Sequence, residues 1–344
     1  MAEIIFTDLE RQGIARLANL PYSWNKLRNS TVLISGGTGF IGSHLIAVIK
    51  ERNQLFGDNI SIICLSRGGG EEKDNVKFIK CDVSQEVQIQ EQVDYIVHLA
   101  SNTHPEQYAK NPIETITTNV LGCNNLLKLA TRKKAKRFLL ASSVEIYGDG
   151  TDKPMSESYC GCIDCNTVRA GYNEAKRLSE SMCQAYRQQF GVDCVVARFA
   201  RVFGADRKPD SKAMAQFIEK AVQGEDIVLK SDGKQRYSYC YLLDAVSGLL
   251  KVLMDGVSGE AYNIANDDIG YTLGDYAEYI ANIAGRKVVF DLENGQAGAS
   301  KVTVALLDCA KLKALGWSQI SSVLSGIDKT YYIKRSIVCA NSQL

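Results

Sequence analysis

The sequence predicts an α/β fold, in which a doubly wound parallel sheet is joined to a smaller C-terminal lobe. Two observations carry this prediction. Short apolar runs without glycine or proline alternate with stretches of helical periodicity, which is typical of buried parallel strands covered by helices. A glycine-rich turn also follows the first apolar run directly and leads into a helical stretch. In such a sheet, ligands bind beyond the carboxyl ends of the strands.

The strands and helices can be assigned in chain order from their periodicity. Residues 8–17 form an amphipathic helix ahead of the first strand, which covers residues 31–35. Helices with apolar side chains at i, i+3 and i+4 are expected over residues 117–132 and 172–190. Further buried strands are expected at residues 60–66, 76–79, 95–100, 137–142 and 194–199.

The turn at residues 36–42 reads GGTGFIG and predicts a Rossmann-type nucleotide site. Gly36, Gly39 and Gly42 allow a tight turn, approach of the backbone to a pyrophosphate, and close packing of the helix. The N-terminus of the helix that begins here offers unpaired N–H groups to an anion. We therefore predict that a nucleotide binds at this turn.

Tyr172 and Lys176 have the four-residue spacing that places two side chains on one face of a helix. A free tyrosine titrates near pH ~10. A neighbouring ammonium group favours the phenolate and lowers that pKa, so the two residues together can move a proton. The spacing also occurs on solvated helices, and its interpretation therefore depends on the segments upstream.

Two serines follow the apolar part of the strand expected at residues 137–142. The carboxyl end of a strand faces the ligand in this fold. Ser143 can therefore hydrogen-bond a substrate oxygen while Tyr172 moves the proton. Ser142 and Ser143 could otherwise be turn residues. The tyrosine and lysine downstream favour the catalytic interpretation.

In combination, these motifs resemble those of the extended short-chain dehydrogenase/reductase (NAD-dependent epimerase/dehydratase) family, whose members modify nucleotide-linked sugars. The resemblance covers residues 31–334. It implies an NAD(P)-dependent enzyme of Rossmann fold, with Ser143, Tyr172 and Lys176 as the catalytic triad. Glu145, an acidic residue retained beside the triad, is a further expected catalytic residue. Tyr172 would donate or accept the proton while hydride is transferred.

The resemblance also implies which residues hold the cofactor. Asp82 and Val83 would contact the adenine, and Asn119 would help to hold the catalytic lysine. Leu99, Ala100 and Ser101 would line the cofactor. The full expected set is Gly36, Thr38, Gly39, Phe40, Ile41, Gly42, Ser66, Arg67, Asp82, Val83, Leu99, Ala100, Ser101, Asn119, Ala141, Tyr172 and Lys176.

The substrate residues are expected in the later part of the chain and in one early loop. Residues 233–241 resemble the family's strand whose arginine binds the diphosphate of the sugar nucleotide, and Arg236 is the candidate for that role. A guanidinium group suits it because it can bind phosphate oxygens in pairs. Phe217 lies in a segment that resembles the helix covering the nucleotide base, although a plain amphipathic surface helix is the alternative. His104 lies in a loop near the sugar, where it could also be a local hydrogen-bonding residue. Ser143 and Arg201 complete the expected set.

The identity of the cofactor depends on the end of the second expected strand. NAD-specific sites usually carry Asp or Glu there to bind the ribose 2′-hydroxyl, and this acid is missing. Ser66 and Arg67 instead predict a preference for NADP(H) over NAD(H), because an arginine can accommodate a 2′-phosphate. Arg67 could otherwise stack on the adenine or point into solvent.

Two residues depart from the family pattern and bear on the reaction. Position 144 is valine where 4,6-dehydratases carry the aspartic acid that protonates the departing hydroxide. Dehydration is therefore disfavoured. Position 201 is arginine where many members carry asparagine, so the substrate contacts differ from those of the best-known epimerases.

With dehydration disfavoured, two candidate reactions remain for this enzyme. In the main hypothesis, NADPH reduces a keto sugar linked to a nucleoside diphosphate. Residues 163–172 resemble the substrate loop of reductases that make CDP-linked sugar alcohols for bacterial capsules, which makes a CDP-linked ketose a candidate substrate. In the alternative, bound NAD oxidises C4 transiently, as in the UDP-glucuronate decarboxylases and 4-epimerases of this family. The segment order resembles that of the decarboxylases. A catalytically silent regulatory protein is disfavoured, because Tyr172 and Lys176 are both present.

Composition excludes several other classes of protein. The net charge of +1 gives no electrostatic case for binding nucleic acid. No apolar stretch approaches the ~18 residues of a membrane span, and the N-terminus lacks the pattern of a signal peptide, so a cytoplasmic location is expected. The 11 cysteines are then expected to be thiols. Cys160, Cys162 and Cys165 cluster, but no histidine pair at ligand spacing accompanies them, and we predict no metal site.

The predicted organisation is one nucleotide domain with a smaller lobe. Residues 1–30 form a helical extension and residues 31–200 the Rossmann domain, to which residues 237–265 return. Residues 201–236 and 266–334 form the substrate lobe, and residues 335–344 a tail. The helices around residues 120–132 and 172–190 correspond to the pair that forms a four-helix interface in the family, so a homodimer is expected.

Overall fold

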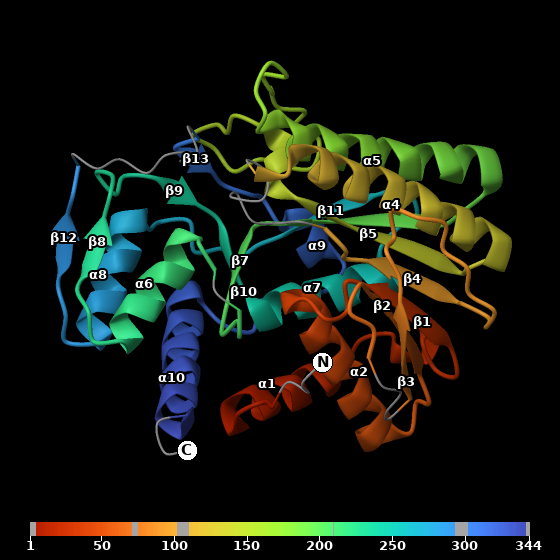
Figure 1. The fold of residues 1–344 in the computed structure, drawn as a ribbon, viewed down its shortest axis with the longest axis horizontal. Helices are drawn as coiled ribbons and strands as arrows, with labels where there is room; N and C mark the ends of the chain where they lie inside the picture. The colour runs from red at the N-terminus through yellow and green to blue at the C-terminus, as the bar shows by residue number, and fades with distance from the viewer. Residues whose placement is uncertain (1–4, 71–74, 102–109, 209, 293–301, 342–344) are drawn as a thin grey trace.

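The computed structural model describes residues 5–70, 75–101, 110–208, 210–292 and 302–341 and confirms the predicted α/β fold (Figure 1). Its centre is a sheet of seven strands in which every neighbouring pair is parallel. The strand order is β11 (Ala261–Ile264), β6 (Cys194–Phe199), β5 (Arg137–Ser143), β4 (Tyr95–His98), β1 (Thr31–Ser35), β2 (Ser61–Ser66) and β3 (Val76–Lys80). The chain order reverses between β1 and β4, which is where a doubly wound sheet opens its ligand crevice.

Helices cover both faces of this sheet, because side chains alternate between the faces along each strand. Val32 and Ile34 of β1 pack in one core with buried residues of α2 (Phe40–Phe56) and α7 (Leu242–Asp255). Leu33, between them, belongs to the core on the opposite face, with residues of α4 (Pro112–Lys133) and α5 (Ala170–Phe190). Figure 1 shows α4 and α5 lying along each other over that face.

The remaining elements form a smaller lobe beside the main sheet. Three parallel strand pairs belong to it: β7 (Arg201–Phe203) with β10 (Tyr239–Tyr241), β8 (Ile227–Leu229) with β12 (Val288–Phe290), and β9 (Arg236–Tyr237) with β13 (Val304–Ala305). Its helices α6 (Ala213–Val222), α8 (Leu273–Ile283) and α10 (Val323–Asn341) pack on one another, as Figure 1 shows. The short helix α9 (Ala310–Ala314) lies against β11, and the turns η1 (Trp24–Lys26) and η2 (Val144–Tyr147) are single 3₁₀ turns.

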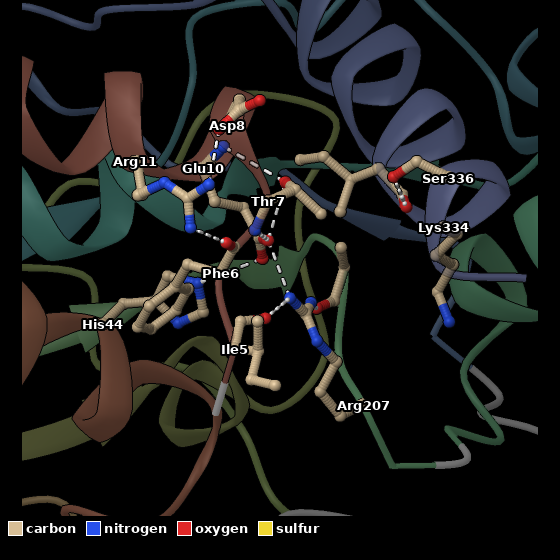
Figure 2. A network of polar contacts seen from close by, with 12 residues as sticks. Ile5, Phe6, Thr7, Asp8, Glu10, Arg11, His44, Arg207, Lys334 and Ser336 are labelled. Atoms are coloured by element: carbon tan, nitrogen blue, oxygen red, sulfur yellow. Dashed lines mark hydrogen bonds and ion pairs between the residues drawn. The ribbon is translucent and has the colours of Figure 1, made fainter. Parts of the chain in front are cut away.

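The N-terminal helix α1 (Asp8–Ala18) joins the two parts of the molecule (Figure 2). Thr7 and Glu10 form a capping box at its start. The buried carboxylate of Glu10 also binds Arg207, which follows β7, at 2.7 Å, and lies 3.9 Å from Nε2 of His44 on α2. The side chain of Glu10 on α1 therefore contacts both α2, which follows the glycine turn, and the segment after β7 in the smaller lobe.

The observed boundaries differ from the expected ones at two informative places. The helix expected from residue 117 begins at Pro112, because a proline at the first helical position lacks only an N–H that would have no partner there. The strand expected to reach residue 100 ends at His98. The N–H of Ala100 donates to the side chain of Ser35 at 3.3 Å instead of continuing the ladder.

Within the described ranges, no helix has the length and apolar character needed to cross a bilayer.

Candidate active site

Tyr172 and Lys176 are both buried on the first turns of α5, where the helix packs against β5. The Nζ atom of Lys176 donates a hydrogen bond to the carbonyl oxygen of Ala141 at 2.8 Å and lies 5.8 Å from the ring centroid of Tyr172. Burial lowers the pKa of Lys176 to about 8. The structure therefore brings the phenol and the ammonium group near each other at the end of β5.

Asn119, which was expected to help hold the catalytic lysine, lies on the neighbouring helix α4. Its Nδ2 donates to the carbonyl of Thr115 at 2.7 Å, and its Oδ1 accepts from the hydroxyl of Ser101 at 2.9 Å. Its main-chain carbonyl accepts from the hydroxyl of Ser179 on α5 at 3.3 Å. Asn119 therefore contacts the segment after β4 through its side chain and α5 through its main-chain carbonyl.

Ser143 is the last residue of β5 and caps the turn η2. Its hydroxyl accepts a hydrogen bond from the N–H of Glu145 at 3.3 Å. The Glu145 carboxylate forms an ion pair with Arg169, the residue before α5, at 3.4 Å. Val144 is buried in the apolar core. The hydroxyl, the acid and the beginning of the tyrosine helix are therefore neighbours, whereas position 144 offers no polar group.

The glycine turn has the shape that the phosphates of a dinucleotide need. Gly36 has a φ of +73°, and a Cβ there would lie 2.8 Å from the main-chain N of Ala100. A Cβ at Gly42 would lie 2.4 Å from the carbonyl oxygen of Gly36. Gly39 caps α2 without a side-chain hydrogen bond, so the first N–H groups of the helix face the turn. These features fit a bound nicotinamide dinucleotide.

The other expected cofactor residues also lie near the carboxyl ends of the strands. The hydroxyl of Ser66 donates to the carbonyl of Gly69 at 3.2 Å, and the Arg67 side chain is 71% exposed and pairs with Glu114 at 3.0 Å. The Asp82 carboxylate accepts from Ser84. Val83 is buried, and Leu99, Ala100 and Ser101 directly follow β4. Phe40 and Ile41 are the first residues of α2, and Thr38 lies in the turn before it.

Three of the expected substrate residues, Arg201, Phe217 and Arg236, lie in the smaller lobe. The guanidinium carbon of Arg201 lies 3.6 Å from the ring centroid of Tyr237, and Nη2 of Arg236 donates to the carbonyl of Ile269 at 3.4 Å. Phe217 is buried on α6. His104 lies outside the described residues.

Ser35 and His98, to which the sequence patterns gave no role, meet between β1 and β4. The Ser35 hydroxyl accepts from the N–H of Ala100 and lies 2.7 Å from Nδ1 of His98, to which it can donate its own proton. Burial, and next the charge of Lys176, lower the pKa of His98 to about 3, so this histidine is neutral. The position of Ser35 directly before the glycine turn was the signal that could have identified it.

The clustered cysteines do not form a metal centre with other described side chains. Cys160, Cys162 and Cys165 are exposed thiols on the segment between η2 and α5. In the parts of the chain that the structure describes, no group of three or more histidine, cysteine or acidic side chains is placed to hold a metal.

Similarity to known proteins agrees with this geometry. The family model described as "NAD dependent epimerase/dehydratase family" matches residues 32–265. The chain is 33% identical over 324 residues to UDP-glucuronic acid decarboxylase 1 of Danio rerio, covering 91% of this chain and 75% of the relative. It is 36% identical over 280 residues to UDP-glucuronic acid decarboxylase 5 of Arabidopsis thaliana, covering 76% of this chain and 79% of the relative.

Solved structures share the fold at lower identity. The UDP-glucose 4-epimerase of Thermotoga maritima superposes with a TM-score of 0.78 at 24% identity, covering 90% of this chain and 99% of the epimerase. The UDP-glucuronic acid 4-epimerase of Bacillus cereus superposes with a TM-score of 0.75 at 21% identity, covering 89% and 99%. The chain therefore belongs to the NAD-dependent epimerase/dehydratase (extended short-chain dehydrogenase/reductase) family of enzymes, which modify sugar nucleotides with a nicotinamide dinucleotide.

Proposed function

We propose that the protein is a decarboxylase of UDP-glucuronate that oxidises C4 of the sugar transiently. The observation that carries this proposal is the combination of an intact Ser143, Tyr172 and Lys176 arrangement with a buried valine at position 144. Similarity to UDP-glucuronic acid decarboxylases over nine-tenths of the chain supports it. Transient oxidation of C4 was the alternative reaction expected from the sequence. We now prefer it to net reduction of a keto sugar.

The proposed roles of the three residues follow from their chemistry. The Tyr172 phenolate takes the proton of the C4 hydroxyl, and the buried Lys176 cation favours that phenolate. The Ser143 hydroxyl holds the same sugar oxygen. A nicotinamide dinucleotide, when bound at the glycine turn, supplies the two-electron acceptor and donor for hydride at C4.

Loss of carbon dioxide then needs no acid at position 144. A ketone at C4 makes the C6 carboxylate that of a β-keto acid. The C5–C6 bond breaks, its electron pair forms the C4–C5 enolate, and carbon dioxide leaves. A proton added at C5 regenerates the ketone, which is then reduced. In dehydration, by contrast, a departing hydroxide must be protonated, and Val144 has no proton to give.

We propose NAD rather than NADP as the cofactor. The NADP preference expected from Ser66 and Arg67 has no support from the comparisons. The matched family is described as NAD dependent, and the UDP-glucose 4-epimerase of Thermus thermophilus, a solved structure of the same fold, was determined with NAD. The Arg67 guanidinium is also paired with Glu114, and a 2′-phosphate would have to compete with that carboxylate.

The same relatives do not support net reduction of a keto sugar for capsule precursors, because those described above are decarboxylases and epimerases. A 4-epimerase is the second candidate. It shares the transient C4 ketone and the same three residues. It differs in that the carboxylate is kept and that hydride returns to the opposite face of C4, which inverts that carbon.

The test is to incubate the purified protein, with and without added NAD, with UDP-glucuronate, and to follow the nucleotide sugars by chromatography and carbon dioxide release. We expect a UDP-pentose and equimolar carbon dioxide without net change in absorbance at 340 nm. A UDP-hexuronate epimer would instead support the second candidate. Stoichiometric NADPH consumption with CDP- or UDP-linked keto sugars, and no conversion of UDP-glucuronate, would overturn the proposal.

We further propose that residues 201–236 and 266–334 bind the sugar nucleotide against the Rossmann domain.

We also propose that α4 and α5 form a homodimer interface. Leu121 on α4 and Leu178 on α5 are 44% and 48% exposed, which supports an apolar contact there. Light scattering after size exclusion tests the dimer, and a single-chain mass at micromolar concentration would contradict it.

A further inference from the structure

Arg201 has a buried N–H that no described residue satisfies. It begins β7, and its guanidinium carbon lies 3.6 Å from the ring centroid of Tyr237. The Nη1 atom is buried without a hydrogen-bond partner, and no ion pair joins this side chain to a carboxylate in the described part of the chain. Desolvating a charged donor without an acceptor is costly, and native proteins rarely leave such groups unpaired. An anionic group of a ligand would satisfy it.

The position of Arg201 indicates which part of the ligand that group belongs to. Arg201 lies two residues after Phe199 of β6, whose Cα pairs with that of Ser143 on β5. Burial raises the pKa of Tyr237, and the charges of Arg201, Glu145 and Arg169 also act on its hydroxyl. Glu145 follows Ser143 by two residues and bonds its hydroxyl through the main chain. Arg201 therefore borders the same region as the hydroxyl that holds the reacting sugar oxygen.

A second arginine is available for the phosphates. Arg236 precedes Tyr237 on β9, and successive side chains of a strand point to opposite faces. Its guanidinium group donates to the carbonyl oxygen of Ile269, whereas that of Arg201 stacks on Tyr237. The two guanidinium groups thus have separate surroundings and can bind separate anionic groups.

We propose that Arg201 binds a carboxylate on the sugar and determines specificity for nucleotide-linked hexuronic acids over neutral hexoses. This proposal rests on the proposed function and assigns a residue to its substrate class. The planar guanidinium can bind both carboxylate oxygens, and stacking on Tyr237 fixes its plane before the ligand arrives. The charge at position 201 is what distinguishes this chain from family members with a neutral asparagine there.

The test compares three ligands on the protein carrying Tyr172→Phe, which keeps the site while preventing turnover. UDP, UDP-glucose and UDP-glucuronate are titrated by calorimetry in the presence of NAD. The two sugars differ only at C6, which is a hydroxymethyl group in one and a carboxylate in the other. We expect UDP-glucuronate to bind more tightly than UDP-glucose. Adding Arg201→Gln should weaken UDP-glucuronate about tenfold or more and leave UDP and UDP-glucose nearly unchanged.

Three further variants keep the result interpretable if Arg201→Gln is unstable. Tyr237→Leu removes the stacking surface and should reduce the preference for UDP-glucuronate, whereas Tyr237→Phe keeps the ring and should preserve it. Arg201→Lys should retain part of the preference, because it keeps the charge without the planar fork.

Equal weakening of all three ligands by Arg201→Gln would overturn the proposal, since Arg201 would then contact the diphosphate. Equal affinity of the Tyr172→Phe protein for UDP-glucose and UDP-glucuronate would also overturn it. The binding result is separate from the reaction. If UDP-glucuronate binds through Arg201 but is epimerised instead of decarboxylated, the proposed function fails and the carboxylate assignment stands.

Discussion

The ammonium group of Lys176 donates a hydrogen bond to the main-chain carbonyl of Ala141 at 2.8 Å, and this bond ties α5 to the carboxyl end of β5. Ser143 lies two residues further along the same strand, on the same face as Ala141. One strand therefore anchors the cation and presents the hydroxyl. The relative position of the two groups is fixed by the geometry of β5 and needs no loop to set it.

We expect Tyr172→Phe to abolish turnover, by about 10³-fold or more, while NAD affinity changes less than about twofold. Phenylalanine keeps the ring in its buried place and removes only the hydroxyl group that carries the transferable proton. Turnover is followed with UDP-glucuronate and NAD binding by calorimetry. Activity close to that of the natural protein would refute the proton-transfer role of Tyr172.

The pH dependence of the rate should report Lys176. Burial lowers the pKa of its ammonium group to about 8, so its charge is present below about pH 8 and is lost as the pH rises further. We therefore expect kcat to fall above about pH 8. Lys176→Arg cannot lose its charge in this range, so its rate, although lower, should not fall there. A natural enzyme whose kcat stays constant up to pH 10 would contradict this assignment.

Much of the site could be predicted from sequence because its signals are local. The glycine turn, the strands and the Tyr172–Lys176 spacing each occupy one short segment. The contacts that could not be predicted join distant segments. Glu114, which pairs with Arg67, lies 47 residues away from it, and Arg207 lies 197 residues from Glu10. Periodicity says nothing about such pairs, since they depend on how the elements pack.

Gly42→Ala should weaken NAD binding by about tenfold or more. The added Cβ would lie 2.4 Å from the carbonyl oxygen of Gly36 and 2.6 Å from Cα of Gly37, so the glycine turn would have to shift. Gly270→Ala is the matched control, because a Cβ there meets nothing within 4 Å. Calorimetric titration of both variants with NAD is the measurement. Equal affinities in the two variants would show that the turn does not hold the dinucleotide.

Glu114→Gln should raise the affinity for NADP several-fold without changing that for NAD. The substitution releases the Arg67 guanidinium from its 3.0 Å ion pair and makes its charge available to a 2′-phosphate. Because both side chains are largely exposed, the effect should shrink as salt is added. Arg67→Ala together with Glu114→Gln is the control and should abolish the gain. If the natural protein already prefers NADP, the proposed NAD dependence is wrong.

Glu10→Gln should destabilise the protein at neutral pH, and the difference should disappear in acid. Burial acts to raise the pKa of Glu10, but the hydrogen bonds from His44, Arg207 and Thr7 outweigh it and hold the pKa at about 2. A pKa lowered from 4.5 to about 2 corresponds to roughly 3 kcal/mol of stability. Because the pKa is lower in the folded state, this contribution is complete above about pH 4.5 and is lost as the pH falls towards 2.

Urea unfolding of the two proteins between pH 7 and pH 3.5 is the measurement for Glu10. The free energy of unfolding should differ by a constant amount down to about pH 5, and the difference should then narrow by about 1.4 kcal/mol for each pH unit. Glutamine can keep the capping box with Thr7, so the variant tests the charge and not the cap. Asp8→Asn removes a neighbouring carboxylate that is 85% exposed and should have little effect at any pH. A Glu10→Gln difference that does not depend on pH would mean that shape, and not the ion pair with Arg207, holds α1 between the two lobes.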